Sequence, residues 1–132
     1  MEIIRGSCQC GKVSYEVRPP FSTFRYCFCP RCRKATGSAH ASNLVADPRR
    51  FSWKTGEKYV KRYDLPEAKC FAVCFCIECG SPLPHATRSG REVIIPAGSL
   101  DVEVRQVPIE KLHFDSRANW YKNPEDIIDD NI

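Results

Sequence analysis

The sequence contains no long apolar run. No segment approaches the ~18 apolar residues that a membrane-spanning helix needs. The N-terminal stretch MEIIRGSCQCGK also lacks the apolar region of a signal peptide. We therefore expect a cytoplasmic protein without a membrane partner.

A linker, a low-complexity segment and a strong net charge are missing as well. The 132 residues predict one domain, residues 1–132, with a modest core, since 42% of the residues are hydrophobic. The net charge of +4 is weaker than the basic balance of most dedicated nucleic-acid-binding domains. Nucleic acid is therefore not the expected partner.

Cysteine, in contrast, is abundant. Nine cysteines are an odd number, and their C-x-C and C-x2-C spacings are typical of metal sites rather than of disulfide frameworks. This usage also favours a reducing, intracellular setting.

Three cysteines lie in one short stretch, CFCPRCRK. Thiolates this close in sequence can share one Zn²⁺, and three protein ligands leave a fourth position open, as in catalytic zinc sites. We predict that this trio holds a zinc ion and forms the catalytic centre; its members are Cys27, Cys29 and Cys32. The adjacent Arg31, Arg33 and Lys34 are expected to bind an anionic cofactor or to balance the thiolate charge, with ordinary surface charge as the alternative.

Two further pairs lie far apart in sequence, and each ends in glycine. Together they supply four thiolates and predict a closed, structural zinc site, formed by Cys8, Cys10, Cys76 and Cys79. Gly11 and Gly80 permit the positive φ that lets backbone N–H groups approach the sulfurs. Structural zinc binding is worth on the order of 10 kcal/mol, so the zinc-free chain should fold poorly.

The other cysteines and the histidines carry weaker signals. Cys74 is a candidate fourth ligand, although Cys70 and Cys74 also fit small buried side chains of an alternating strand. His40, His85 and His113 can ligate zinc by their chemistry, but none has the spacing of a zinc motif.

Alternating apolar residues and turn signals predict a mainly β fold of several small antiparallel sheets with little helix. The expected strands are residues 12–18, 21–26, 43–46, 51–53, 58–63, 69–75, 92–95, 101–107 and 111–114. The one expected helix covers residues 124–129, with Asn123 as its N-cap and Pro124 at its first position.

Three motifs carry a resemblance to a known family. They are Gly6-x-Cys8-x-Cys10-Gly11-x-Val13-x-Tyr15, Cys27-x-Cys29-x2-Cys32-Arg33-Lys34-x2-Gly37 and Phe75-Cys76-x2-Cys79-Gly80-Ser81-x-Leu83. Together they resemble the glutathione-dependent formaldehyde-activating enzymes, also called centromere-protein-V-like proteins, from Gly6 to about Trp120. Two features depart from that pattern: Phe28 stands where many members carry histidine, and Cys70 and Cys74 are extra.

The resemblance implies a tent-like zinc fold, a structural zinc on the four-cysteine site and a more weakly held zinc on the trio. It also implies a carbon-sulfur lyase that joins glutathione and formaldehyde to S-hydroxymethylglutathione. We therefore expect a small thiol and an aldehyde as partners. His40 and Glu78 are the nearest candidates for a general acid or base.

Two other functions stay open at this point. A non-catalytic zinc-binding module for protein or nucleic-acid partners is favoured by the basic cluster and by the aromatic side chains of Phe24, Tyr26 and Phe28. A thiol redox sensor would use Cys70 and Cys74.

Overall fold

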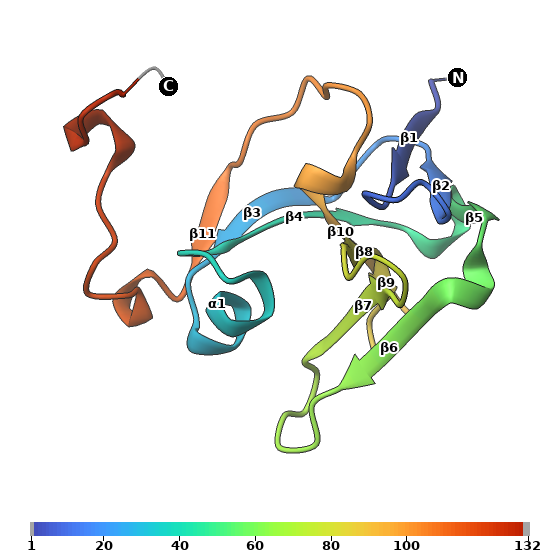
Figure 1. Cartoon of the computed structure of the whole chain (residues 1–132), viewed down its shortest axis with the longest axis horizontal. Coiled ribbons are helices and arrows are strands. Elements are labelled where there is room, and N and C mark those ends of the chain that lie inside the picture. The colour runs from blue at the N-terminus through green and yellow to red at the C-terminus, as the bar shows by residue number, and fades with distance from the viewer. Residues whose placement is uncertain (1, 131–132) are drawn as a thin grey trace.

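The structure is a computed structural model that describes residues 2–130. Over that range the chain forms three small sheets and one α-helix, α1 (Pro30–Thr36), with short 3₁₀ turns between the strands (Figure 1). The strands are β1 (Ile4–Ser7), β2 (Ser14–Val17), β3 (Thr23–Cys27), β4 (Ala41–Ala46), β5 (Phe51–Thr55), β6 (Val60–Asp64), β7 (Ala72–Cys76), β8 (Pro82–Leu83), β9 (His85–Ala86), β10 (Val93–Pro96) and β11 (Glu110–Leu112). The prediction of a mainly β fold with little helix is confirmed.

The three sheets have the strand orders β1-β2-β5, β11-β3-β4-β10-β9 and β6-β7-β8. Neighbouring strands are antiparallel with one exception, the parallel pair of β11 and β3, in which Leu112 lies opposite Cys27. That pair corrects the expectation of purely antiparallel sheets. It brings a segment from late in the chain beside the strand that leads into the cysteine trio.

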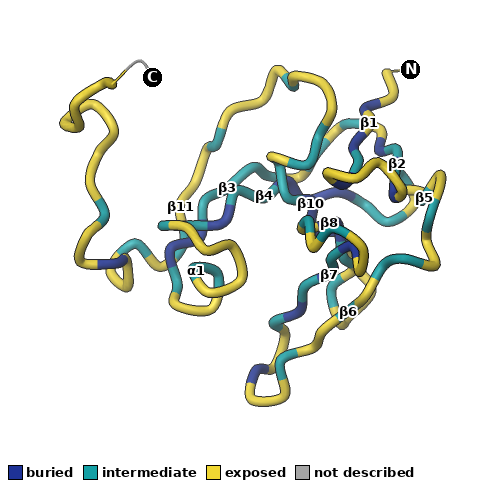
Figure 2. Tube along the Cα trace, in the orientation of Figure 1, coloured by how far each residue is buried: buried dark blue, intermediate teal, exposed yellow. Residues whose placement is uncertain are grey.

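Two separate clusters of buried side chains form the core. The larger one joins the first two sheets and consists of Ile4, Tyr15, Val17, Leu44, Ala46, Val93 and Ile95. The smaller one consists of Cys8, Val13, Cys74, Cys76 and Leu83, so two cysteines of the predicted four-cysteine site are themselves core residues. The buried segments in Figure 2 follow these strands, while the chain after β11 is largely exposed.

Three local predictions are wrong. Residues 101–107 form no strand, because no neighbouring strand pairs with them and Val102 and Val107 are exposed. The expected helix at residues 124–129 is a single 3₁₀ turn, Pro124–Asp126, although Asn123 caps it as predicted. Helix α1 was not predicted, since the one expected helix was at residues 124–129. No helix among residues 2–130 is long and apolar enough to cross a membrane.

Candidate metal centres and the adjoining cavity

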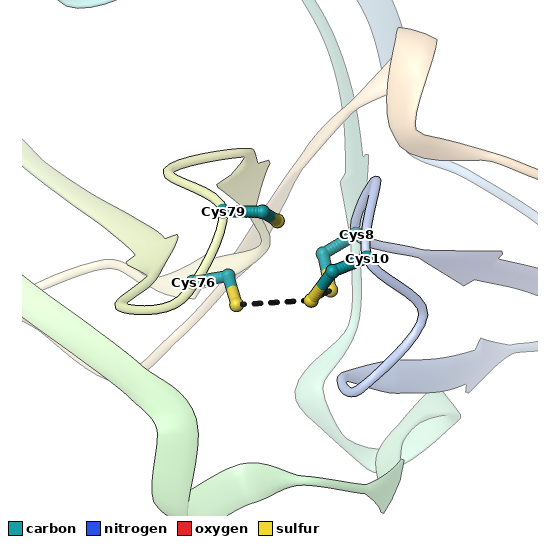
Figure 3. A group of neighbouring side chains, drawn as sticks. All are labelled: Cys8, Cys10, Cys76 and Cys79. Atoms are coloured by element: carbon teal, nitrogen blue, oxygen red, sulfur yellow. Dashed lines mark hydrogen bonds between the residues drawn. The ribbon is translucent and has the colours of Figure 1, made fainter.

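The two distant cysteine pairs meet at one point. Cys8 and Cys10 lie on the turn after β1, Cys76 ends β7, and Cys79 lies on the turn that follows β7 (Figure 3). Their four Sγ atoms all lie within 4.8 Å of one another. The contacts from Cys10 Sγ to Cys8 Sγ and Cys76 Sγ are 3.5 and 3.9 Å. The structure therefore brings together all four residues of the predicted closed site.

The backbone around this cluster is shaped for it. Gly11 and Gly80, which end the two pairs, have φ of 79° and 76°, as expected for tight turns around sulfur atoms. The Val13 N–H donates to Cys8 Sγ at 3.3 Å. Ser81 joins the two turns, because its hydroxyl contacts Cys79 Sγ at 3.2 Å and accepts from the Gln9 N–H at 3.0 Å.

These hydrogen bonds favour thiolate over thiol. The Ser81 hydroxyl and backbone N–H, with further help from Cys10, lower the pKa of Cys79 to about 5 from an ordinary value of 9.0. At neutral pH this group therefore offers an anionic ligand before any cation arrives.

The trio forms a second, more local cluster. Strand β3 ends at Cys27, Cys29 is the N-cap of α1, and Cys32 lies in the first turn of the helix. The three Sγ atoms lie within 4.8 Å of one another. Cys29 Sγ accepts the Cys32 N–H at 3.3 Å, an ordinary N-cap bond made by sulfur. Pro30 at the helix start and Gly37 at its end, with φ of 63°, confine α1 to two turns.

Ionisation is uneven within the trio. Burial raises the pKa of Cys29, but hydrogen bonds from the Cys32 backbone and the neighbouring thiols outweigh it and lower that pKa overall. Burial and the adjacent thiols raise the pKa of Cys32, and burial is the main reason why the pKa of Cys27 is raised. Cys29 therefore ionises most readily of the three, and a nearby cation is needed to ionise all three together.

Both clusters fit zinc on the chemistry of their donors. Zn–S bonds of about 2.3 Å in a tetrahedron place the sulfurs about 3.8 Å apart, close to the contacts in the four-cysteine cluster. All-sulfur donor sets select soft or borderline cations. Neither cluster includes a histidine or carboxylate among the described residues. The four-cysteine cluster can fill a tetrahedron, whereas the trio leaves one position for another ligand.

An aromatic cluster packs against the trio. Phe28 is only 2% exposed and meets Phe114 and Tyr121 edge-on, with ring centroids 4.9 and 5.3 Å away. Its N–H donates to the Leu112 carbonyl at 3.0 Å. His40 lies 4.9 Å from the Phe28 ring and stacks on Tyr26 at 4.0 Å. The residue that departs from the family pattern is therefore a packing residue that holds the trio's backbone.

The other candidate ligands lie outside both clusters. Cys74 is buried in the smaller core, as its position in an alternating strand predicts, whereas Cys70 is exposed, and neither belongs to a sulfur cluster. His85 and His113 join neither cluster. Glu78 forms an ion pair with Lys12 at 2.7 Å on the turn of the four-cysteine site and is not part of the trio's cluster.

The predicted anion-binding residues lie on α1. Arg31 and Lys34 are exposed, whereas Arg33 is half-buried and donates from Nη2 to the Ser116 carbonyl at 3.3 Å. The Arg33 Nε is buried without a hydrogen-bond partner among the described residues. Arg31 and Lys34 therefore keep the free cationic groups, while Arg33 partly serves to hold the later segment.

A cavity of about 400 Å³ opens beside the trio. Cys32 lines it from α1, together with polar side chains from α1, β4 and the segment before β4, namely Thr36, His40, Ser42 and Asn43. The sequence did not reveal this cavity, because four segments separated along the chain contribute its walls. The same cavity reaches β7, β9 and β10.

Most of the chain matches the sequence profile of one known protein family. The profile of the family described as glutathione-dependent formaldehyde-activating enzyme matches residues 3–116. The chain belongs to this family. Within the matched range lie all seven clustered cysteines and every residue of the cavity. This formaldehyde-activating enzyme family acts on glutathione and formaldehyde, so a small-molecule thiol and an aldehyde are the family's partners.

A solved structure shares the fold. The crystal structure of a Rhodobacter sphaeroides protein superposes with a TM-score of 0.64 at 23% identity, covering 81% of this chain and 98% of that one. No curated protein matches the chain.

Proposed function

We propose that this member of the glutathione-dependent formaldehyde-activating enzyme family is a zinc-dependent carbon-sulfur lyase that forms or cleaves adducts between a thiol, glutathione, and an aldehyde. One observation carries the proposal: the three-sulfur cluster, with one ligand position to spare, opens on a cavity large enough for a small molecule. A purely structural site has no use for either feature.

The two clusters take different roles in this proposal. Cys8, Cys10, Cys76 and Cys79 hold a structural zinc, and the catalytic trio Cys27, Cys29 and Cys32 holds a second, more labile zinc. Zinc bound at the trio would favour the ionised form of a thiol substrate, as it does for coordinating thiols in general.

His40 is placed to move the proton. Its Nδ1 lies 3.1 Å from the Ala41 carbonyl oxygen and 3.4 Å from the Ser42 hydroxyl, and the tautomer in which Nδ1 donates to that carbonyl leaves Nε2 as the acceptor. The ring lines the same cavity as Cys32. In the proposed reaction His40 takes the thiol proton, the sulfur attacks the aldehyde carbon, and the proton returns to the new hydroxyl oxygen. The reverse sequence cleaves the C–S bond.

The exposed cations of α1 complete the site. Glutathione carries two carboxylates, which Arg31 and Lys34 can bind at the surface, with Arg33 beside them. The three thiolates are also partly balanced by these charges. The seven clustered cysteines, all free in the structure, must stay reduced for this purpose, which supports a cytoplasmic setting. The proposal assigns both zinc sites to one domain, residues 1–132.

The test combines metal content with turnover. Protein purified without chelator should contain two zinc ions per chain and accelerate exchange between ¹³C-formaldehyde and S-hydroxymethylglutathione, followed by exchange NMR. Cys29→Ala should retain one zinc ion and lose the acceleration, while Cys70→Ser, at an exposed cysteine outside both clusters, should change neither. One zinc ion in all three proteins, with no acceleration, would refute the proposal.

The structure gives less support to a non-catalytic module that stacks on nucleic acid. Phe28 is buried, Phe24 packs against the larger core and Tyr26 stacks on His40, so all three rings are engaged in contacts within the protein.

A further inference from the structure

The far wall of the cavity differs from the wall beside the trio. Helix α1 and strand β7 lie on the same side of the five-stranded sheet (Figure 1), and the cavity occupies the space between them. On the β7 side its lining is largely hydrocarbon, with contributions from Phe71, Val73, Phe75, Leu83 and Ile94. The cavity is therefore polar near the trio and largely apolar on the β7 side, where Cys74 and His85 are the exceptions.

This cavity carries no charged side chain. Arginine, lysine, aspartate and glutamate are all missing from its lining in the described structure. Two titratable side chains, Cys74 and His85, lie on the far wall, and burial, together with the nearby Arg62 guanidinium, lowers the pKa of His85 to about 4. His85 is therefore neutral at pH 7, and the far wall offers no counter-ion to a carboxylate or an ammonium group.

The volume of the cavity is also too large for formaldehyde. A water molecule occupies about 30 Å³ in the liquid, so the two heavy atoms of formaldehyde need about 60 Å³. The cavity measures about 400 Å³. Glutathione does not suit the remaining space, because two carboxylates and an ammonium group would lose their hydration without gaining partners.

The loop that carries Phe71 is held firmly in place. Arg88 donates to the backbone carbonyls of Leu65, Ala68, Lys69 and Phe71 at 2.7–3.0 Å. One guanidinium thus fixes the loop before β7, and Phe71 stands as a preformed part of the wall rather than as a side chain that closes over any ligand.

We propose that the far half of the cavity binds the hydrocarbon part of an uncharged aldehyde of about six to eight carbons, so that the preferred electrophile is an apolar aldehyde rather than formaldehyde. This inference rests on the proposed function for the thiol, which stays outside with its charged groups on α1. The aldehyde carbon then lies toward Cys32 and His40, and the chain lies against Phe71, Val73 and Ile94.

The test compares aldehydes by the acceleration over the uncatalysed reaction with glutathione, which removes differences in intrinsic reactivity. Hexanal and benzaldehyde should be accelerated at least ~10-fold more than formaldehyde, and glyoxylate, which carries a carboxylate, less than formaldehyde. Phe71→Asp should remove the preference, so that the ratio of the accelerations of hexanal and formaldehyde falls to about one. Tyr63→Asp is the matched control, because Tyr63 is a half-exposed aromatic residue of the adjacent strand β6 that does not line the cavity.

A second measurement does not depend on turnover. Titration with 1-hexanol should shift the methyl NMR signals of Val73, Leu83 and Ile94, and Phe71→Asp should weaken these shifts while circular dichroism confirms the fold. Preference for formaldehyde, together with unshifted methyl signals, would overturn the inference and leave the proposed function standing. Lack of acceleration with every aldehyde would overturn the proposed function itself. This result differs from a preference for formaldehyde, which would overturn only the inference about the cavity.

Discussion

The two cysteine clusters are built from similar knuckles but differ in what they connect. The four-cysteine cluster joins residues 8–10 to residues 76–79, and its Cys8 and Cys76 are part of a hydrophobic core. The trio spans only residues 27–32 and rests on a two-turn helix. Metal at the first cluster closes a long loop of the chain, whereas metal at the second orders six residues that β3, β11 and the aromatic cluster already hold.

The difference separates stability from chemistry. A four-sulfur site is complete and has no position for substrate, while a three-sulfur site is incomplete and faces a cavity. Loss of metal from the four-cysteine cluster should therefore unfold the protein, whereas loss of metal from the trio should abolish activity and leave the fold intact. The following predictions test this division, starting with the largest effect.

Replacement of Cys76 by serine should abolish folding. Cys76 is fully buried and belongs to both the metal cluster and the core, and structural zinc binding is worth on the order of 10 kcal/mol. A domain's whole stability is of the same order, roughly 5–15 kcal/mol. Circular dichroism and thermal unfolding should show an unfolded chain for Cys76→Ser and native behaviour for the exposed Cys70→Ser. A cooperative transition in Cys76→Ser near that of the wild type would contradict the structural role.

Replacement of Cys29 should remove activity and leave the fold intact. Cys29→Ala loses one ligand and also the N-cap acceptor of α1, at a cost of about 1 kcal/mol. Cys29→Ser is the sharper control, since its hydroxyl can still cap the helix but binds zinc poorly. Both variants should lack the second zinc by metal analysis, and only Cys29→Ala should lose stability in denaturant unfolding. Equal destabilisation in both would show that the metal, not the cap, supports the helix.

Ser81 offers a finer test at the structural site. Without its hydroxyl the pKa of Cys79 should rise from about 5 toward the ordinary 9.0. A thiol whose pKa is lower in the folded than in the unfolded chain stabilises the fold at pH values above its unfolded-state pKa. This stabilisation is lost as the pH falls through its folded-state pKa. Because the folded-state pKa of Cys79 is higher in Ser81→Ala, this variant should release zinc at a higher pH. Zinc affinity should also fall about 10- to 100-fold. Release can be followed with a chromogenic chelator during an acid titration, and an unchanged midpoint would exclude this role for Ser81.

The smallest effect is expected at the cations of α1. Lys34→Gln should raise KM for glutathione about two- to five-fold with kcat unchanged, because an exposed charge pair is worth 0.2–1 kcal/mol at most. Added salt should remove the difference. Arg91→Gln, at another exposed cation outside the site, should have no effect on KM. A fall in kcat with constant KM would place Lys34 in the chemistry instead of in binding.

Spacing in the sequence predicted which sulfurs cluster, because a C-x-C or C-x2-C turn determines the geometry of a pair locally.

Helix α1 was missed although Pro30, Arg33, Lys34 and Gly37 carry the signals of a helix start and end. Seven residues with no buried side chain give no apolar period to detect. Caps mark the ends of a helix but do not create one.

The opposite error occurred near the end of the chain. Asn123 and Pro124 are correct as cap and first residue, yet the following Ile127 and Ile128 are exposed, so no apolar face stabilises further turns.

The cavity was not predicted from the sequence for another reason. His40, Phe71 and Ile94 come from three strand regions whose pairing no local pattern specifies.

The aromatic contacts of Phe28 have a consequence for how the protein can be handled. Phe114 and Tyr121, which pack against Phe28, come from the final quarter of the chain and contain no metal ligand. A protease cut or a bulky insertion between Leu112 and Tyr121 would leave both cysteine clusters complete in sequence. It would, however, disrupt the contacts that hold Phe28, and with it the backbone between Cys27 and Cys32. The segment from Leu112 to Tyr121 therefore supports the second metal site without contributing a ligand to it.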